Sequence, residues 1–451
     1  MFNYKDLNTI KEKCRYILNS FSDSINDTQK IISVTIDING ERNKLINEIN
    51  PFIKPYFFQS QKVFLYGLID EYNFIFNTNE DYKSKKNHML DIISSSFFIN
   101  SEINNKTYLF GGLNFDLNNK NYNIWKNTPV ANFVLPRYII NEDKLIINFY
   151  NNSNLSKTES FNILNQYIND LDCIFKLKKE DYNKSNLIDI KDLITKSNYH
   201  EKLNMTIRNL KFKSSELSKV IHSRMKKVSF TKNVPLLRIF KNLIFKNKQS
   251  MTFLYTISKE VSTIGSSPEL ILSKSSNVIK SESIAGSNFS RERDDFKSDS
   301  KEVYEQKIVT DYILDFFNKN SINVKYNSIP SIKKSSKIEH LCTSFSATLK
   351  NKKNILDLLS EIHPTPAIGG YPKQKAIDNI RNFKENRGWY GGPIGWIDNS
   401  LDGRFYLNIR SGMSLENDLY LFSGSGITEK SIAKNEWEET EHKFKLMIDS
   451  L

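Results

Sequence analysis

Strand-like and helix-like segments alternate through the second half of this chain without a regular order of strand–helix–strand units. Strand-like runs occur at 253–258, 270–274, 406–409 and 419–422. Apolar residues recur at helical spacing over 303–318, and 436–451 reads as a terminal helix. Gly424 and Gly426 follow the last strand-like run and are expected to break it. This order predicts an α+β fold and argues against a sheet built from βαβ repeats.

The first half opens with a helical pattern over 5–20 and a strand-like run over 30–38. The aromatic-rich segment 52–76 is interrupted by Gly67, which predicts two paired strands. Asparagine-rich surface loops are expected at 114–128 and 150–154. Residues 155–213 are polar and helical in character, and we interpret them as a helical excursion within one domain because strand patterns resume on both sides.

Cysteine usage and hydropathy limit the class of protein. Cys14, Cys173 and Cys342 are too few and too scattered for a disulfide framework or a zinc site. The chain has no apolar run of about 18 residues, the length that a membrane span requires. The sequence Met-Phe-Asn-Tyr-Lys-Asp at 1–6 lacks the apolar region of a signal peptide. We therefore expect a cytoplasmic protein with no membrane partner.

The formal net charge of +13 has two interpretations. A strongly basic protein can bind a polyanion such as nucleic acid. The excess here is lysine, in a chain also rich in Asn, Ile and Phe, and basic residues are dispersed with short clusters at 176–179 and 333–334. No stripe of interleaved aromatic and arginine residues is present to follow a nucleic-acid strand. We interpret the charge as compositional drift towards AT-rich codons and expect no nucleic-acid partner. A nucleic-acid-binding protein is kept as the alternative from another class.

Two short stretches each place one titratable side chain beside a predicted strand. Ser-Lys-Val-Ile-His-Ser-Arg at 218–224 offers Lys219, and Gly-Ser-Ser-Pro-Glu-Leu at 265–270 offers Glu269. A lysine and a glutamate that face one pocket form a base and acid pair when burial disfavours the charge on each. Either stretch alone is a weak signal, because lysines at strand edges are usually solvated.

Further motifs follow these stretches in order along the chain. They are Ala-Gly-Ser at 285–287, Ser-Lys-Glu-Val-Tyr-Glu-Gln at 300–306, His-Leu-Cys-Thr at 340–343, His-Pro-Thr-Pro-Ala at 363–367, Tyr-Gly-Gly-Pro at 390–393, Ile-Arg at 409–410, Gly-Ser-Gly-Ile at 424–427 and Glu-Trp-Glu-Glu-Thr at 436–440. The series resembles the chorismate-utilising enzymes, which include isochorismate, salicylate, anthranilate and aminodeoxychorismate synthases. The resemblance covers about 205–451 and is fainter upstream, at 110–115 and 133–137. We expect 1–50 to be a divergent helix and strand, and 51–451 to be one chorismate-utilising domain.

The resemblance implies an α+β fold in which two large antiparallel sheets pack as a sandwich with helices outside, as in anthranilate synthase component I. It implies that Lys219 activates water and that Glu269 donates a proton to the departing C4 hydroxyl of chorismate. Glu305 and Glu439 are the implied ligands of Mg²⁺, a hard cation that prefers carboxylate oxygens. Gln306 departs from the family pattern, since many relatives carry His there, but it leaves the ligand assignment intact.

The resemblance also implies a set of substrate-binding residues. They are Gly286, Ser287, His340, Ala367, Ile368, Tyr390, Arg410, Gly424, Gly426 and Lys443. Arg410 can hold the enolpyruvyl carboxylate in a bidentate fork, with Tyr390 as a hydroxyl donor. Backbone N–H groups of the glycines can approach the substrate because no Cβ intervenes, although plain turn geometry explains these glycines nearly as well. His340 also fits a hydrogen-bonded core histidine, and Lys443 lies one helical turn beyond Glu439 on the same face.

Three positions distinguish members of the family. Ala285 stands where one type of aminodeoxychorismate synthase has a nucleophilic lysine, and Lys219 is present where ammonia-using anthranilate synthases replace it. Ala367, followed by Ile368, stands where pyruvate-eliminating enzymes tend to have Thr. The resemblance therefore implies a Mg²⁺-dependent isochorismate synthase that reversibly isomerises chorismate. We expect it to serve menaquinone biosynthesis as a monomer or weak dimer. Siderophore biosynthesis is the other pathway considered, and salicylate synthase the alternative activity.

Overall fold

A computed structural model describes most of the chain. The described residues are 4–20, 22–25, 28–38, 49, 53–99, 105–152, 155–175, 185–212, 216–288, 300–335 and 338–451. The basic cluster at 176–179 lies outside them. In the described ranges, no helix has the combination of length and apolar character that crossing a bilayer requires.

Strand β6 (Ala131–Asn141) joins two antiparallel sheets. One edge of β6 pairs with β3 (Phe64–Phe76) along its whole length. On the other edge, the start of β6 pairs with β5 (Tyr108–Leu113) and its end pairs with β7 (Lys144–Tyr150). The hydrogen-bonded ladder therefore passes through β6 from one sheet into the other.

The first sheet leads away from β6 through β3. Its strands in spatial order after β3 are β2 (Pro55–Gln59), β10 (Met251–Thr256), β11 (Val261–Ser267), β20 (Ser411–Leu415), β21 (Asp418–Ile427), β9 (Lys219–Phe230) and β8 (Leu187–Asp192), and β17 (Gly370–Tyr371) pairs with the start of β9. This sheet brings strands from both halves of the chain into one surface.

The second sheet leads away from β6 through β5. Its strands are β18 (Pro393–Asp398), β19 (Gly403–Leu407), β12 (Leu270–Ser275), β13 (Val278–Asn288) and β16 (Ile338–Leu349), with β14 (Ser321–Tyr326) and β15 (Ser331–Ser335) both paired to β16. Among the described strand pairs, only β1 (Ile31–Asp37) with β4 (Phe97–Ile99) is parallel. The fold is α+β, as the sequence predicts.

Aromatic side chains fill the space between the sheets. The ring of Phe58 on β2 lies 5.3 Å from that of Trp396 on β18, in an edge-on arrangement. The ring of Tyr56, also on β2, lies 6.5 Å from that of Phe110 on β5. Because β2 belongs to the first sheet and β5 and β18 to the second, these contacts hold the sheets face to face as a sandwich.

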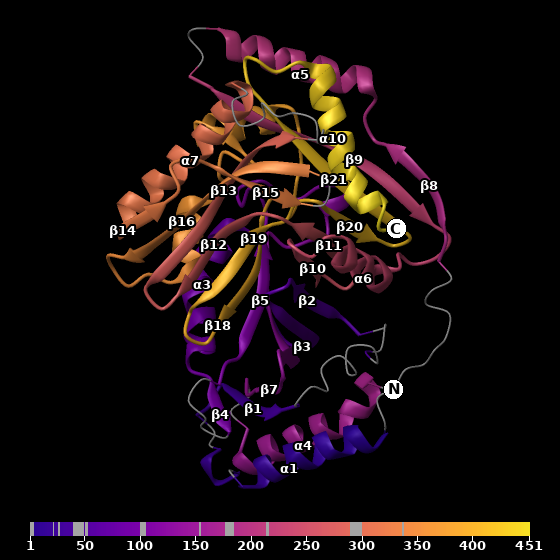
Figure 1. The fold of residues 1–451 in the computed structure, drawn as a ribbon. Helices are drawn as coiled ribbons and strands as arrows, with labels where there is room; N and C mark the ends of the chain where they lie inside the picture. Colours follow the sequence, from indigo (N-terminus) through magenta and orange to yellow (C-terminus); the bar gives the residue numbers. More distant parts are fainter. Residues whose placement is uncertain are drawn as a thin grey trace.

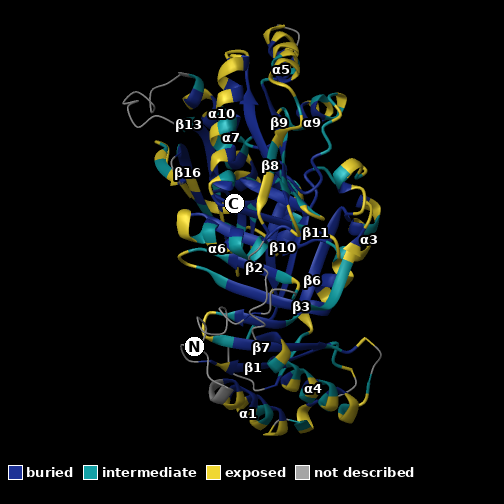
Figure 2. Ribbon diagram, turned by 90° about the vertical axis from the view of Figure 1, so that its right-hand side faces the viewer, coloured by how far each residue is buried: buried dark blue, intermediate teal, exposed yellow. Residues whose placement is uncertain are grey.

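Helices cover the outside of the sandwich, with their buried faces turned inward (Figure 1, Figure 2). They are α1 (Tyr4–Ser20), α3 (Asn79–Ser94), α4 (Lys157–Phe175), α5 (Lys196–Lys211), α6 (Leu236–Lys246), α7 (Ser300–Asn320), α8 (Ile355–Ile362), α9 (Lys373–Asn382) and α10 (Ala433–Ile448). Helix α7 packs on β13 and β16, and α10 packs on β21 and α5. These two helices place carboxylates against both sheets.

The N-terminal helix and strand pack against later segments. Helix α1 lies beside α4 at one end of the molecule (Figure 1). Strand β1 forms a seven-residue antiparallel ladder with β7. The division at residue 50 remains a prediction, although β1 shares its hydrogen bonds with strands beyond that boundary.

Glycines account for two differences from the sequence-based expectations. The turn between β2 and β3 lies at 60–63, and Gly67 is inside β3, where a Cβ would approach Pro136 Cγ to 2.5 Å. Strand β21 runs through Gly424 and Gly426 without a break. In both places the glycine permits close packing inside a ladder and does not end the strand. Residues 155–213 also contain strand β8 between α4 and α5.

Candidate active site

Both sheets, together with α7 and α10, line a partly open cavity. The residues predicted for catalysis, metal binding and substrate binding all line it: Lys219, Glu269, Gly286, Ser287, Glu305, His340, Ala367, Ile368, Tyr390, Arg410, Gly424, Gly426, Glu439 and Lys443. They come from segments that span more than 200 positions of the chain. The fold thus brings every predicted position to one place, while the chemical role of each remains a prediction.

Lys219 is the first residue of β9 and is only 1% exposed. Its Nζ lies 3.3 Å from Glu305 Oε2 on α7. Gly426, on the neighbouring strand β21, makes room for this pair, because a Cβ there would lie 2.7 Å from Glu305 Oε2 and 2.9 Å from Lys219 Cε. The lysine is therefore a buried group that faces the cavity, and it is not solvated at a strand edge.

Glu269 lies in the turn that connects β11 to β12, and it is 4% exposed. Burial, and next the negative charge of Glu282, raise its pKa to about 8, although Lys333, Lys219 and Lys443 pull it down. A carboxylic acid with this pKa is mainly protonated at neutral pH. Glu269 can therefore donate a proton to a group in the cavity.

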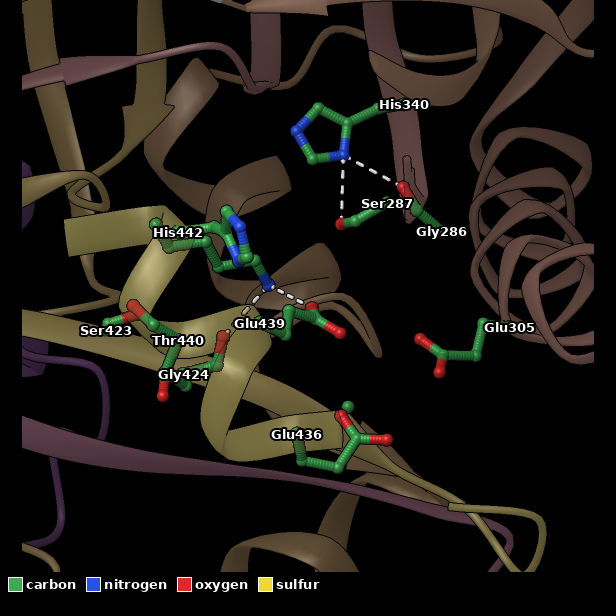
Figure 3. A network of polar contacts seen from close by, with 12 residues as sticks. Gly286, Ser287, Glu305, His340, Ser423, Gly424, Glu436, Glu439, Thr440 and His442 are labelled. Atoms are coloured by element: carbon green, nitrogen blue, oxygen red, sulfur yellow. Dashed lines mark hydrogen bonds and ion pairs between the residues drawn. The ribbon is translucent and has the colours of Figure 1, made fainter. Parts of the chain in front are cut away.

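His340 on β16 links the second sheet to Arg410. Its Nδ1 lies 2.8 Å from the carbonyl oxygen of Gly286, so this nitrogen carries the proton and donates it (Figure 3). Nε2 is then free to accept from Arg410 Nη2 at 3.2 Å. Burial and the nearby Arg410 lower the pKa of His340 to about 3, so the ring is neutral. Ser287 Oγ lies 3.3 Å from Nδ1.

Arg410 adopts a backbone φ of 50°, in the left-handed region that non-glycine residues rarely occupy. It sits in the bend between β19 and β20 and is 7% exposed. Burial removes part of the hydration of the guanidinium and lowers its pKa to about 10. Because this pKa is still well above neutral pH, Arg410 carries its charge there. A buried arginine held in an uncommon backbone conformation and lining a cavity is suited to bind a carboxylate.

Tyr390 and Lys443 also line the cavity. The Tyr390 ring stacks on Phe422 with 5.0 Å between centroids, and burial raises its pKa to about 12, so it is a neutral donor. Lys443 Nζ donates to Glu439 Oε1 at 2.5 Å and to the Gly424 carbonyl at 2.9 Å (Figure 3). These two residues therefore present a phenol and an ammonium group to the cavity.

Glu305 on α7 and Glu439 on α10 extend their carboxylates towards a common space (Figure 3). Glu302 and Glu436 lie three positions earlier on the same two helices, and both are buried. Burial, and then repulsion by Glu305 and Glu439 respectively, raises the pKa of Glu302 and of Glu436 to about 7. Lys301 Nζ lies 2.7 Å from Glu436 Oε1 and only partly compensates this negative charge.

The donor set fits a hard cation. Among the described residues, no three His, Cys, Asp or Glu side chains already converge as a metal site. Mg²⁺ commonly takes only one or two protein carboxylates and completes its shell with water and an anionic substrate. Glu305 and Glu439 supply two such carboxylates at one cavity, and the buried Glu436 Oε2 has no hydrogen-bond partner within the described part of the chain. These residues therefore suit Mg²⁺.

Comparison with known proteins decides the family. The chorismate binding enzyme family matches residues 17–451. The chain belongs to this family. A relative with curated function is the isochorismate synthase MenF of Bacillus subtilis (strain 168), which is 34% identical over 249 residues, or 53% of this chain and 52% of the relative. This chain thus spans about half the length of the curated relatives it matches.

Solved structures of low identity share the fold of this chorismate binding enzyme. The menaquinone-specific isochorismate synthase MenF of Escherichia coli superposes with a TM-score of 0.79 at 19% identity, covering 99% of this chain and 100% of that chain. Anthranilate synthase component I of Streptococcus pneumoniae TIGR4 gives a TM-score of 0.67 at 20% identity, covering 93% and 92%. These likenesses confirm the predicted sandwich architecture.

One residue that sequence reasoning missed holds two walls of the cavity together. Arg387 donates from Nη1 to the Ile368 carbonyl at 2.8 Å and from Nη2 to the Ile221 carbonyl. Glu385 Oε2 lies 2.9 Å from Arg387 Nη2 and so orients the guanidinium. The contact ties the Ala367–Ile368 loop to β9 two residues beyond Lys219. The available signal was the charged pair in Glu-Asn-Arg-Gly at 385–388, just before the glycine-rich turn.

Proposed function

We propose that this chorismate binding enzyme is an isochorismate synthase. The observation that carries the proposal is the placement of two buried titratable groups in one cavity: Lys219, paired with Glu305, and Glu269, whose pKa is raised to about 8. Such a pair can remove a proton from water and deliver another to a leaving hydroxyl. Similarity to the Bacillus subtilis isochorismate synthase supports the same activity.

In the proposed reaction, Lys219 takes a proton from water as the water oxygen forms a bond to C2 of chorismate. The ring double bonds shift, and the C4–oxygen bond breaks. Glu269 gives its proton to that oxygen, which leaves as water. One water is consumed and one is released, so the product is an isomer, and the proton gained by Lys219 balances the proton lost by Glu269. The bonds broken and formed are of the same kind, so chorismate and isochorismate are close in free energy and the reaction runs in both directions.

The remaining cavity residues bind and orient the substrate. In this proposal Arg410 binds the enolpyruvyl carboxylate and the Tyr390 hydroxyl is a further donor, and both residues line the cavity. Glu305 and Glu439 are the residues that would hold Mg²⁺, which when bound supplies positive charge for the ring carboxylate. The neutral His340 ring is hydrogen-bonded to the Gly286 carbonyl and to the Arg410 side chain. It therefore links the part of the cavity wall formed by Gly286 to the part formed by Arg410.

Product analysis tests the proposal. With chorismate and Mg²⁺ at neutral pH, the protein should give a mixture of chorismate and isochorismate with little salicylate or pyruvate, because Ala367 places no hydroxyl against the product. Lactate dehydrogenase reads pyruvate directly, and Ala367→Thr should increase it. Stoichiometric pyruvate from the unmutated protein would identify it as a salicylate synthase, and the absence of any chorismate turnover would overturn the proposal.

We also propose that the enzyme acts in the cytoplasm, as a monomer or weak dimer, in menaquinone biosynthesis. The support for the pathway is its similarity to the Bacillus subtilis MenF protein. Expression of this chain in a strain that lacks its menaquinone-specific isochorismate synthase should restore menaquinone. Restoration of catechol siderophore synthesis alone, in a matched strain, would assign the other pathway.

A further inference from the structure

A partly buried ion pair lies next to the turn that carries Glu269, and neither of its members lines the cavity. Lys333 Nζ on β15 is 2.6 Å from Glu282 Oε2 on β13, and the two side chains are 24% and 22% exposed. The same Glu282 oxygen is 3.5 Å from the backbone nitrogen of Leu270, the residue that follows Glu269. The pair therefore lies next to the turn that presents Glu269, and the reaction proposed above assigns it no role.

Strand geometry places both charges on the face of the second sheet that forms the cavity. Ile284, two residues beyond Glu282 on β13, lines the cavity, and alternate residues of a strand share a face. Lys333 is directly opposite His340 in the ladder between β15 and β16, and His340 also lines the cavity. Glu282 and Lys333 thus project towards the same side as the site residues.

We propose that the Glu282–Lys333 pair sets the protonation of Glu269, with Glu282 keeping this acid in its proton-bearing form at neutral pH. The proposal extends the function proposed above. It rests on that function in one respect, which is the role of Glu269 as the proton donor. Glu282 does not touch the substrate in this scheme. It is a positioning residue that acts through the charge it holds beside Glu269.

The charges around Glu269 show why such a residue is needed. Basic side chains act on it from several elements: Lys219 from β9, Lys333 from β15, Lys443 from α10 and Arg410 from the bend before β20. Each of these, in its charged form, stabilises the ionised carboxylate and so favours loss of the proton. Glu282 opposes them from β13, and burial acts in the same direction as Glu282. The thiol of Cys342 on β16 is uncharged, because burial and Glu282 raise its pKa to about 12.

The two members of the pair act on Glu269 in opposite directions, which gives the proposal a signed test. Glu282→Gln removes the anion and leaves Lys333 uncompensated, so the alkaline limb of the kcat profile should move to lower pH by about one unit. Lys333→Met leaves Glu282 uncompensated, so the limb should move to higher pH by a similar amount. The double variant should return close to the unmutated profile. Limbs that stay in place, or that move in the same direction in both single variants, would overturn the proposal.

Matched controls separate a charge effect from a structural one. Glu361 forms a similar ion pair, with Lys353 at 2.6 Å and with side chains 30% and 33% exposed, but on α8. Glu361→Gln should leave the limb unmoved. Glu282→Asp retains the charge and should keep the limb near its original position. If Glu282→Asp moved the limb as far as Glu282→Gln does, the shape of the side chain, not its charge, would be responsible, and the proposal would fall.

A direct titration distinguishes failure of this inference from failure of the proposed function. The infrared carbonyl band of protonated Glu269 can be identified as the band that disappears in Glu269→Gln. Its titration should shift in opposite directions in Glu282→Gln and Lys333→Met. If the band shifts so while the rate profile stays fixed, the inference holds and Glu269 is not the catalytic acid. If the band titrates unchanged in both variants, the pair does not set the protonation of Glu269.

Discussion

Lys219 is a buried lysine whose Nζ lies 3.3 Å from Glu305 Oε2 and whose side chain lines the cavity. Lys219→Ala should lower kcat by about 10²–10⁴-fold, because the attacking water loses its base. Chorismate affinity, measured by calorimetry, should largely survive because Arg410 and Lys443 remain. Lys226→Ala is the matched control, since Lys226 is also buried on β9 but pairs with Asp192 at 2.9 Å, away from the cavity. Near-normal turnover in Lys219→Ala would exclude it as the base.

The proposed role of Glu269 as the acid predicts a pH dependence of definite sign. Its pKa is raised to about 8, so the carboxyl bears a proton below that pH and loses it above. A proton donor works only in the protonated form, so kcat should fall as pH rises through about 8. Glu269→Gln should lose turnover at every pH, because an amide keeps the shape without an acidic proton. A kcat that stays level well above pH 8, or a Glu269→Gln variant that loses only affinity, would remove Glu269 from the acid role.

At the scale of the element, β21 controls how closely β9 and α7 approach one another. Gly426→Ala would place a Cβ 2.7 Å from Glu305 Oε2 and 2.9 Å from Lys219 Cε, so the pair must shift. We expect a large loss of kcat with a melting temperature close to that of the unmutated protein, since both contacts are with the ends of side chains. Gly369→Ala is the control, because a Cβ there meets its nearest neighbours at an ordinary 3.5 Å. Equal effects of the two substitutions on kcat would contradict this account of Gly426.

Local pattern predicted many of the elements because it depends on neighbouring residues alone. The helical spacing at 303–318 became α7 (Ser300–Asn320), and the strand-like run at 30–38 became β1 (Ile31–Asp37). The same local rules failed at Gly67 and Gly424, where the reason for a glycine is a distant partner strand and not a turn. Local periodicity carries no information about contacts with distant strands, so it could not predict that these two strands continue through their glycines.

The candidate site shows the same division between local and long-range information. Resemblance to a family selected residues such as Lys219 and Glu439, which lie far apart in the sequence and meet only in the folded chain. Arg387 was missed because its contacts are with backbone carbonyls, which any residue type can provide at those positions. Glu282 was missed because its effect on Glu269 depends on the register of β13 with β12 and β16.

For the whole molecule, the sandwich places the carboxylates of α7 and α10 on one cavity, and activity should depend on Mg²⁺. Chelation with EDTA should abolish chorismate turnover and added Mg²⁺ should restore it, while circular dichroism shows that the fold is retained. Zn²⁺ should substitute poorly, because the proposed ligands are oxygens and include no His or Cys. Full activity in thoroughly chelated buffer would contradict a metal role for Glu305 and Glu439.

The central claim is that water attacks C2 of chorismate while the C4 hydroxyl leaves, with both steps in the cavity shared by Lys219 and Glu269. Turnover in oxygen-18 water tests it most directly. Mass spectrometry should find one heavy oxygen in the isochorismate formed, located at the C2 hydroxyl, after short incubation with the unmutated enzyme and Mg²⁺. Isochorismate that contains no heavy oxygen would show that the hydroxyl moves within the substrate, and it would contradict the proposed roles of both residues.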